Sequence, residues 1–117
     1  MQNYRNLKIW SLSMELTKNI YEVTQNYPTE EKYGLTSQIR RSAVSIPSNI
    51  AAGAGRNGNK EFNNFLGVAM GSLFELDTQV ELSYDLQFIQ VENYKDILDK
   101  ITQLRKMIFH FQKKLTT

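Results

Sequence analysis

Apolar side chains recur at intervals of three and four residues along four long segments of this 117-residue sequence. An α-helix turns once in about 3.6 residues, so this spacing gathers the apolar side chains on one face of a helix. The segments cover approximately residues 7–27, 35–54, 60–86 and 91–115. The pattern therefore predicts four amphipathic helices, each with an apolar stripe that must be buried against the others.

Helix-breaking residues lie between these segments. Pro28 ends the first helix, because the residue before a proline is pushed out of helical geometry. Gly53, Gly55 and Gly58 form the loop before the third helix. Helices joined by such short loops must run antiparallel. We therefore predict an all-α fold, an antiparallel up-and-down four-helix bundle that forms a single domain over residues 1–117.

Two features inside the predicted helices affect their geometry. Pro47 lies within the second helix, where it removes a backbone donor and crowds the carbonyl group of Ala43, so a kink is predicted there. Gly67 and Gly71 share one face of the third helix, one turn apart. Glycine weakens a helix, and this pair predicts that another backbone packs close to that face.

Composition limits the compartment and the kinds of bond available. The sequence has no cysteine, so disulfides and cysteine-ligated metals are excluded, and this suits a reducing cytoplasm. The first ten residues contain no apolar run of signal-peptide length. No segment reaches the roughly 18 consecutive apolar residues expected of a membrane span. We expect a cytoplasmic protein with no membrane partner.

Candidate catalytic and metal-binding groups lack the partners that such sites need. His110 is the only histidine, and it lies opposite the apolar stripe of its helix. A dimetal bundle needs inward Glu-x-x-His pairs. The acids of the third helix have none: Glu75, Asp77, Glu81 and Asp85. The serines of the second helix have no histidine near them in sequence, and small side chains there permit close packing: Ser42, Ser45 and Ser48. We predict no catalytic residue, cofactor, metal or small-molecule substrate.

The glycines of the second loop fit the pattern G-x-G-x-x-G. A dinucleotide site needs a strand before this pattern, and here a helix precedes it. The pattern is therefore interpreted as a helix stop followed by a turn. The free amides that begin the third helix, with Arg56 and Lys60 beside them, are a lesser candidate for holding a phosphate. Glu61 already complements the dipole of that helix.

Charge is unevenly distributed although the net charge is only +2. Residues 33–60 carry only basic charges: Arg40, Arg41, Arg56 and Lys60. Residues 61–94 carry only acidic ones, and the C-terminal stretch ends in Lys113 and Lys114. Arg40 and Arg41 have two interpretations: salt bridges to Glu75 or Asp77, within the subunit or across an interface, or contacts to the phosphates of a nucleic acid. Lys113 and Lys114 are either a second nucleic-acid contact or a solvated basic tail.

Two helices carry more apolar side chains than one stripe accounts for. The surplus lies on the first and third helices: Trp10, Met14, Tyr21, Val68, Met70 and Phe74. Exposed apolar patches usually mark association surfaces, so homo-oligomerisation is predicted. The alternative is a wide buried face on a central helix of a monomer.

Long stretches of the chain resemble a known family. They are YGLTSQIRRSAVSIPSNIAAGAGR at residues 33–56 and KEFNNFLGVAMGSLFELDTQ at residues 60–79, with LKIW at residues 7–10. These runs resemble the four-helix bundle proteins, also called 23S rRNA-intervening-sequence proteins. The resemblance implies an antiparallel four-helix fold, a ring-like homopentamer and no established enzymatic activity. It extends to the accessory protein of diversity-generating retroelements, in which a basic pentamer surface engages nucleic acid and a reverse transcriptase.

Two positions depart from the family pattern. Ala52 stands where the family usually has glutamate, which puts in doubt any ion pair built on that acid. Gln87 stands where glycine is common. Glutamine must then adopt a left-handed turn at some cost, or end the third helix differently.

Two functional hypotheses follow. In the first, a non-enzymatic homo-oligomeric bundle contacts RNA or DNA through its basic faces. Its contacts would be Arg40, Arg41, Arg56 and Lys60, with Lys113 and Lys114 second. In the alternative, the bundle is a protein-interaction scaffold that makes no direct contact with nucleic acid.

Overall fold

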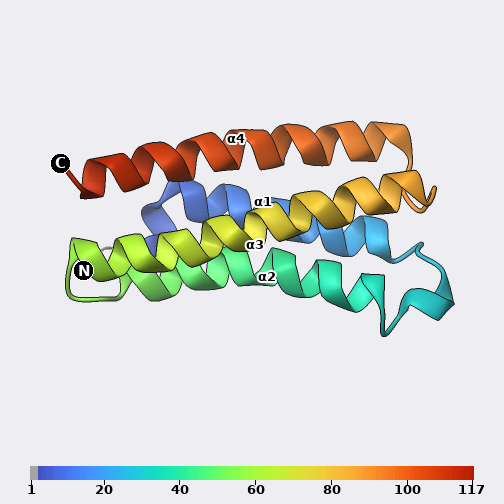
Figure 1. Ribbon diagram of the computed structural model, residues 1–117, viewed down its shortest axis with the longest axis horizontal. Coiled ribbons are helices and arrows are strands. Elements are labelled where there is room, and N and C mark those ends of the chain that lie inside the picture. Colours follow the sequence, from blue (N-terminus) through green and yellow to red (C-terminus); the bar gives the residue numbers. More distant parts are fainter. Residues whose placement is uncertain (1–2) are drawn as a thin grey trace.

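Four α-helices make up most of residues 3–117, the part of the chain that the computed structural model describes (Figure 1). They are α1 (Lys8–Thr24), α2 (Leu35–Ala54), α3 (Asn59–Asp85) and α4 (Val91–Leu115). Short 3-10 turns, η1 (Tyr4–Asn6) and η2 (Thr29–Glu31), precede α1 and α2. No strand occurs in this part, and the predicted four helices are confirmed. The first two residues of the predicted 1–117 domain lie outside the described residues.

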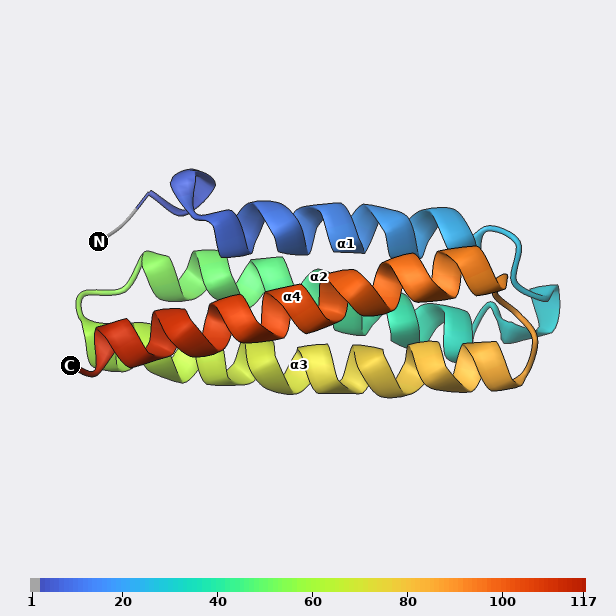
Figure 2. The same ribbon diagram turned by 90° about the horizontal axis from the view of Figure 1, so that it is seen from above.

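Consecutive helices run antiparallel and lie side by side, and α4 closes the bundle by packing against α1 (Figures 1 and 2). The start of α1, the end of α4 and the α2–α3 loop lie at one end of the bundle, whereas the other two loops lie at the opposite end. None of these helices is long and apolar enough to cross a membrane. The topology is the one that short loops impose.

The predicted stripes form the core. Buried apolar side chains from all four helices make one cluster, which includes Leu16, Ile46, Leu73 and Leu104 at no measurable exposure. Each is a large side chain, and burying one stabilises the fold by about 1.5–3 kcal/mol. The first helix ends at Thr24, three residues before the expected end, but Tyr27 still reaches the core edge and packs against Phe88 at 5.5 Å between ring centroids.

Pro47 leaves the carbonyl group of Ala43 without its helical donor, because proline has no N–H. The hydroxyl group of Thr17, on α1, lies 3.1 Å from that carbonyl oxygen and 2.7 Å from the carbonyl oxygen of Ser13, so it can donate to either. A side chain of the neighbouring helix thus supplies a donor for the freed acceptor. The helix α2 is continuous through Pro47, and the kink stays a prediction.

Glycines play different parts from those expected. Gly53 is a buried residue of α2 and not part of the loop, and a Cβ atom there would lie 2.7 Å from Cβ of Phe65. Gly53 therefore lets α2 and α3 approach closely. No part of the described chain packs on Gly67 or Gly71, since a Cβ on either would meet nothing within 4 Å, so the predicted close backbone stays a prediction for a second chain. Both are exposed on α3.

The backbone at the end of α3 shows how the chain accommodates glutamine at position 87, where glycine is common in the family. Its φ of 64° places it in the left-handed region, which costs a non-glycine residue about 1–2 kcal/mol. The amide of Gln87 donates to the carbonyl group of Tyr84, and that of Phe88 donates to Ser83. These two bonds form a Schellman motif, which satisfies the last carbonyl groups of the helix. The glutamine therefore adopts the turn that glycine would make at lower cost.

Gly53→Ala is expected to lower the free energy of unfolding by about 1–3 kcal/mol, because the new methyl group overpacks the α2–α3 contact. Gly55→Ala is the matched control, since its φ is −82° and a Cβ there makes only ordinary contacts. Urea unfolding followed by circular dichroism measures both. Equal stability of the two variants would contradict the close approach at Gly53.

Gln87→Gly is expected to raise the free energy of unfolding by about 1 kcal/mol, because glycine adopts the left-handed conformation without steric cost. Gln25→Gly serves as the control, because Gln25 ends α1 in a right-handed conformation where glycine relieves nothing. Thermal and urea unfolding report both changes. A Gln87→Gly variant no more stable than the parent would show that the turn carries no such strain.

Candidate nucleic-acid and association surfaces

Arg40 ties α2 to the C-terminal end of α1. Its Nε donates a hydrogen bond of 2.8 Å to the hydroxyl oxygen of the buried Thr24, and Nη2 lies 3.4 Å from the carbonyl oxygen of Tyr21. The guanidinium carbon stands 4.6 Å from the centre of the Tyr21 ring. A cation at this position also complements the negative end of the α1 dipole. Arg40 is therefore a packing residue as well as a surface cation.

Arg41 is exposed and makes no hydrogen bond or salt bridge within residues 3–117. It lines two adjoining surface hollows, of about 310 and 490 Å³. Glu75 lines the smaller hollow, but the two side chains form no ion pair in the described chain. Within the described residues, neither Arg40 nor Arg41 forms the predicted salt bridge to Glu75 or Asp77.

The other predicted cations lie at the far end of the bundle. Arg56 is in the α2–α3 loop, Lys60 is in the first turn of α3, and Lys113 and Lys114 are in the last turn of α4. These elements meet at the end of the bundle where α1 starts (Figure 1). All four side chains are exposed. The structure thus divides the six predicted basic residues into this group of four and the Arg40–Arg41 pair.

The predicted association residues differ in exposure. Val68 and Phe74 on α3 are each 53% exposed, and Tyr21 on α1 is 41% exposed. Trp10 and Met70 are partly buried and pack against the core cluster. Met14 is also half-buried. Tyr4, from η1, covers part of Trp10 in an edge-on contact of 5.2 Å between ring centroids. The open apolar surface is consequently concentrated on α3, where Gly67 and Gly71 extend it.

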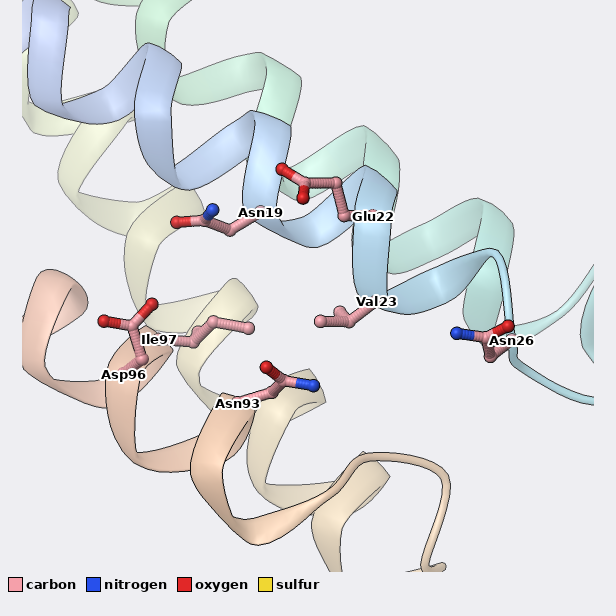
Figure 3. Close-up of a pocket in the computed structure, with 7 residues that line it drawn as sticks. All are labelled: Asn19, Glu22, Val23, Asn26, Asn93, Asp96 and Ile97. Atoms are coloured by element: carbon pink, nitrogen blue, oxygen red, sulfur yellow. The ribbon is translucent and has the colours of Figure 1, made fainter.

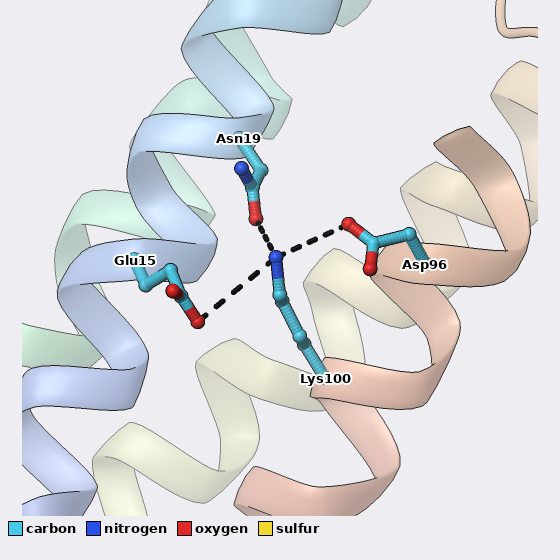
Figure 4. A network of polar contacts seen from close by, with 4 residues as sticks. All are labelled: Glu15, Asn19, Asp96 and Lys100. Atoms are coloured by element: carbon cyan, nitrogen blue, oxygen red, sulfur yellow. Dashed lines mark hydrogen bonds and ion pairs between the residues drawn. The ribbon is translucent and has the colours of Figure 1, made fainter. Parts of the chain in front are cut away.

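A polar network that the sequence analysis did not single out joins α1 to α4. Figure 4 shows Lys100 between Asn19 and Asp96, with Nζ donating bonds of 2.6 and 3.1 Å to their side-chain oxygens. Glu15 lies 3.9 Å from the same nitrogen. Only the four-residue spacing of Asp96 and Lys100 was visible in the sequence. These are the only salt bridges within residues 3–117, so the remaining cations have no acidic partner there.

Next to this network, a small polar pocket of about 180 Å³ lies between α1 and α4 (Figure 3). It is lined by Asn19, Glu22, Val23, Asn26, Asn93, Asp96 and Ile97. It contains neither a nucleophile nor a histidine. Its amide and carboxylate groups come from both α1 and α4 (Figure 3). The pocket is interpreted as the polar rim of the bundle.

Acidic side chains have structural partners at the end of the bundle near the α3–α4 loop. The carboxylate of Glu81 accepts a hydrogen bond of 2.6 Å from the Tyr94 hydroxyl group, and this bond raises the pKa of Tyr94 to about 12. Tyr94 also stacks on Tyr84 at 4.0 Å between ring centroids. These contacts hold α3 and α4 together beside their connecting loop.

The described residues show no constellation for metal or nucleophilic chemistry. No group of three His, Asp or Glu side chains comes together within residues 3–117 in a way that would hold a metal ion. His110 is exposed, as expected from its position opposite the stripe. Ser42 is buried, and Ser45 shares a hydrogen bond of 2.8 Å with Ser72 on α3. These serines pack α2 against α3, and Ser48 is exposed.

Comparison with known proteins places the chain in a family. Residues 5–110 match the family model of the 23S rRNA-intervening sequence protein. The chain belongs to the 23S rRNA-intervening sequence protein family. A crystal structure of a protein of unknown function from the S23 ribosomal protein family of Bacteroides thetaiotaomicron has the same fold. It is 24% identical, with a TM-score of 0.81 over 90% of this chain and 95% of that one. No curated protein matches this chain.

Arg40→Ala is expected to lower the free energy of unfolding by about 1–2 kcal/mol, because Thr24 and the end of α1 lose a charged donor. Arg41→Ala is the adjacent control and should change it by less than about 0.5 kcal/mol, since Arg41 has no partner in the described chain. Chemical denaturation compares the two. Equal losses would show that the arginines have the same structural role.

Proposed function

We propose that this protein is a non-enzymatic, homo-oligomeric helical bundle that binds RNA or DNA through its basic surfaces. The observation that carries the proposal is the set of exposed cations without acidic partners in the described residues: Arg41, Arg56, Lys60, Lys113 and Lys114. A cation without an acidic partner contacts a phosphate without first breaking a salt bridge. Arg56 and Lys113 also lie over the rings of Phe65 and Phe109, at 4.9 and 5.0 Å from the ring centres. Each such contact also releases counterions from the nucleic acid, which favours binding.

The two separated groups of cations suit a long ligand. Arg56, Lys60, Lys113 and Lys114 lie at one end of the bundle, and Arg41 lies on α2 toward the other (Figure 1). The molecule is 44 Å long, and a nucleic-acid backbone presents a negative charge at every nucleotide over such a distance. The protein would act in the cytoplasm, where the nucleic acids of a bacterial cell lie.

Self-association is part of the proposal. Val68, Gly71 and Phe74 leave an exposed apolar face on α3 beside open space at Gly67. A second copy of the chain would cover this face, and the small glycines would let the two backbones approach closely. A ring of five copies, implied by the family resemblance, would repeat the cations around its surface. The alternative remains a scaffold that uses this ring to bind a protein and not a nucleic acid.

Binding to RNA and DNA is expected to weaken steeply as salt rises. Arg41→Gln should lower the slope of log affinity against log salt by about 0.7–0.9, because one phosphate contact is lost. Lys18→Gln removes an exposed cation from α1, outside the proposed surfaces, and should leave the slope nearly unchanged. Fluorescence anisotropy with labelled strands measures both. Failure to retain any RNA or DNA at low salt would refute the nucleic-acid proposal and leave the scaffold.

Light scattering on a sizing column is expected to give a multiple of the 13.6 kDa chain mass, five times that mass for the ring. Gly71→Arg should reduce the mass toward that of one chain, because the side chain enters the proposed contact while the space around it in the monomer is open. Thr102→Arg places the same side chain on an exposed site of α4 as a control. A monomer in the parent protein contradicts self-association.

A further inference from the structure

Tyr33 is the most exposed aromatic side chain in the described part of the protein, at 88%. It lies between η2 and α2 and lines the same two hollows as Arg41. The ammonium group of Lys32 is 5.5 Å from the centre of its ring. An aromatic ring buries apolar surface poorly in this position, and it contributes nothing to the core. We therefore looked to a ligand or partner, and not to the stability of the fold, for the role of Tyr33.

The turn that presents Tyr33 is held by its own hydrogen bonds. The side chain of Glu31 accepts a bond of 3.0 Å from the amide of Leu35, and its carbonyl group accepts one from Gly34. The amide of Lys32 donates to the carbonyl group of Thr29. The backbone on both sides of Tyr33 is thus fixed, and a ligand that contacts the ring orders little backbone on binding.

A second aromatic ring lines the larger hollow. Tyr21 and Tyr33 both line it, and so do the cations Lys32, Arg40 and Arg41. Arg40 is fixed over the Tyr21 ring by its bond to Thr24 on α1. Two rings and three cations thus surround one hollow, and we call this set the tyrosine–arginine surface (Tyr21, Lys32, Tyr33, Arg40 and Arg41). No acid lines the larger hollow.

We propose that the tyrosine–arginine surface binds single-stranded nucleic acid, with an unpaired base stacked on Tyr33 and neighbouring phosphates on Arg41 and Lys32. This inference rests on the proposed function and names the form of nucleic acid that it recognises. Aromatic rings interleaved with cations are the means by which proteins bind single strands, because every base has a face that stacks and every nucleotide carries a phosphate. One face of the Tyr21 ring is covered by Arg40 at 4.6 Å, so the stacked base is placed on Tyr33 alone.

A duplex would use this surface poorly. Its bases are already stacked on one another and paired, so none is free to lie on Tyr33 without the cost of unstacking. Only the cations would contribute to duplex binding, through phosphates. Glu75 lines the neighbouring smaller hollow and repels phosphates from that side. The strand is therefore expected to run from Tyr33 across the larger hollow toward Tyr21, and Glu75→Gln should strengthen binding slightly.

The test uses the full chain and a labelled mixed-sequence strand, as RNA and as DNA, alone and annealed to its complement. The parent protein is expected to prefer the single strand. Tyr33→Ala should weaken single-strand binding at least about fivefold, because one stacked base is lost. Tyr33→Phe, which keeps the ring, should bind like the parent. Tyr84→Ala removes an aromatic ring beside the acidic residues of α3 and is the second control, expected to leave the affinity unchanged.

The outcomes separate the inference from the proposed function. Equal affinity of the parent for single strand and duplex, with no loss in Tyr33→Ala, overturns the single-strand inference while the basic-surface proposal stands. Loss of binding in both Tyr33→Ala and Tyr33→Phe also overturns it, because stacking requires only the ring. If no probe binds at low salt, the proposed function and this inference both fail. Circular dichroism of each variant verifies that the bundle is folded.

Discussion

The close packing of α2 against α3 is the constraint on which the rest of the bundle depends. Gly53 leaves room for Phe65, and Ser45 and Ser72 share a hydrogen bond across the same contact. Small residues on α2 therefore bring two long helices together, and α1 and α4 complete the bundle around them (Figure 2). The same contact fixes which face of each helix is left for solvent and partners.

What the core leaves exposed divides into surfaces of different character. The outer face of α3 is apolar around Val68 and Phe74. Basic groups gather at the end with Lys113 and along α2 at Arg41, whereas acids follow α3 toward the α3–α4 loop. Few of these charged side chains form hydrogen bonds or salt bridges within the described chain. Most cations of the described residues form no salt bridge, and Tyr33 is exposed to solvent, so these groups are available to a partner.

The sequence predicted most of the fold, because periodic apolar stripes and breakers are local features. It placed α2 and α4 at their observed bounds, but it put Gly53 in the loop, whereas Gly53 is buried in α2 against Phe65. Such contacts depend on which helices meet and how closely. The hydrogen bond from Arg40 to Thr24 and the high exposure of Tyr33 could not be predicted from the sequence either. Both depend on tertiary packing, which leaves no periodic pattern in the sequence.

Sequencing the nucleic acid that copurifies with the native protein at low salt would show whether the bundle binds nucleic acid. We expect strands bound above the background of a mock purification, enriched in unpaired regions and released as salt rises. Charge reversal of Arg41, Arg56, Lys60, Lys113 and Lys114 together should abolish the enrichment. A native protein that carries no nucleic acid above background would contradict the account, and a bound protein in its place would favour the scaffold.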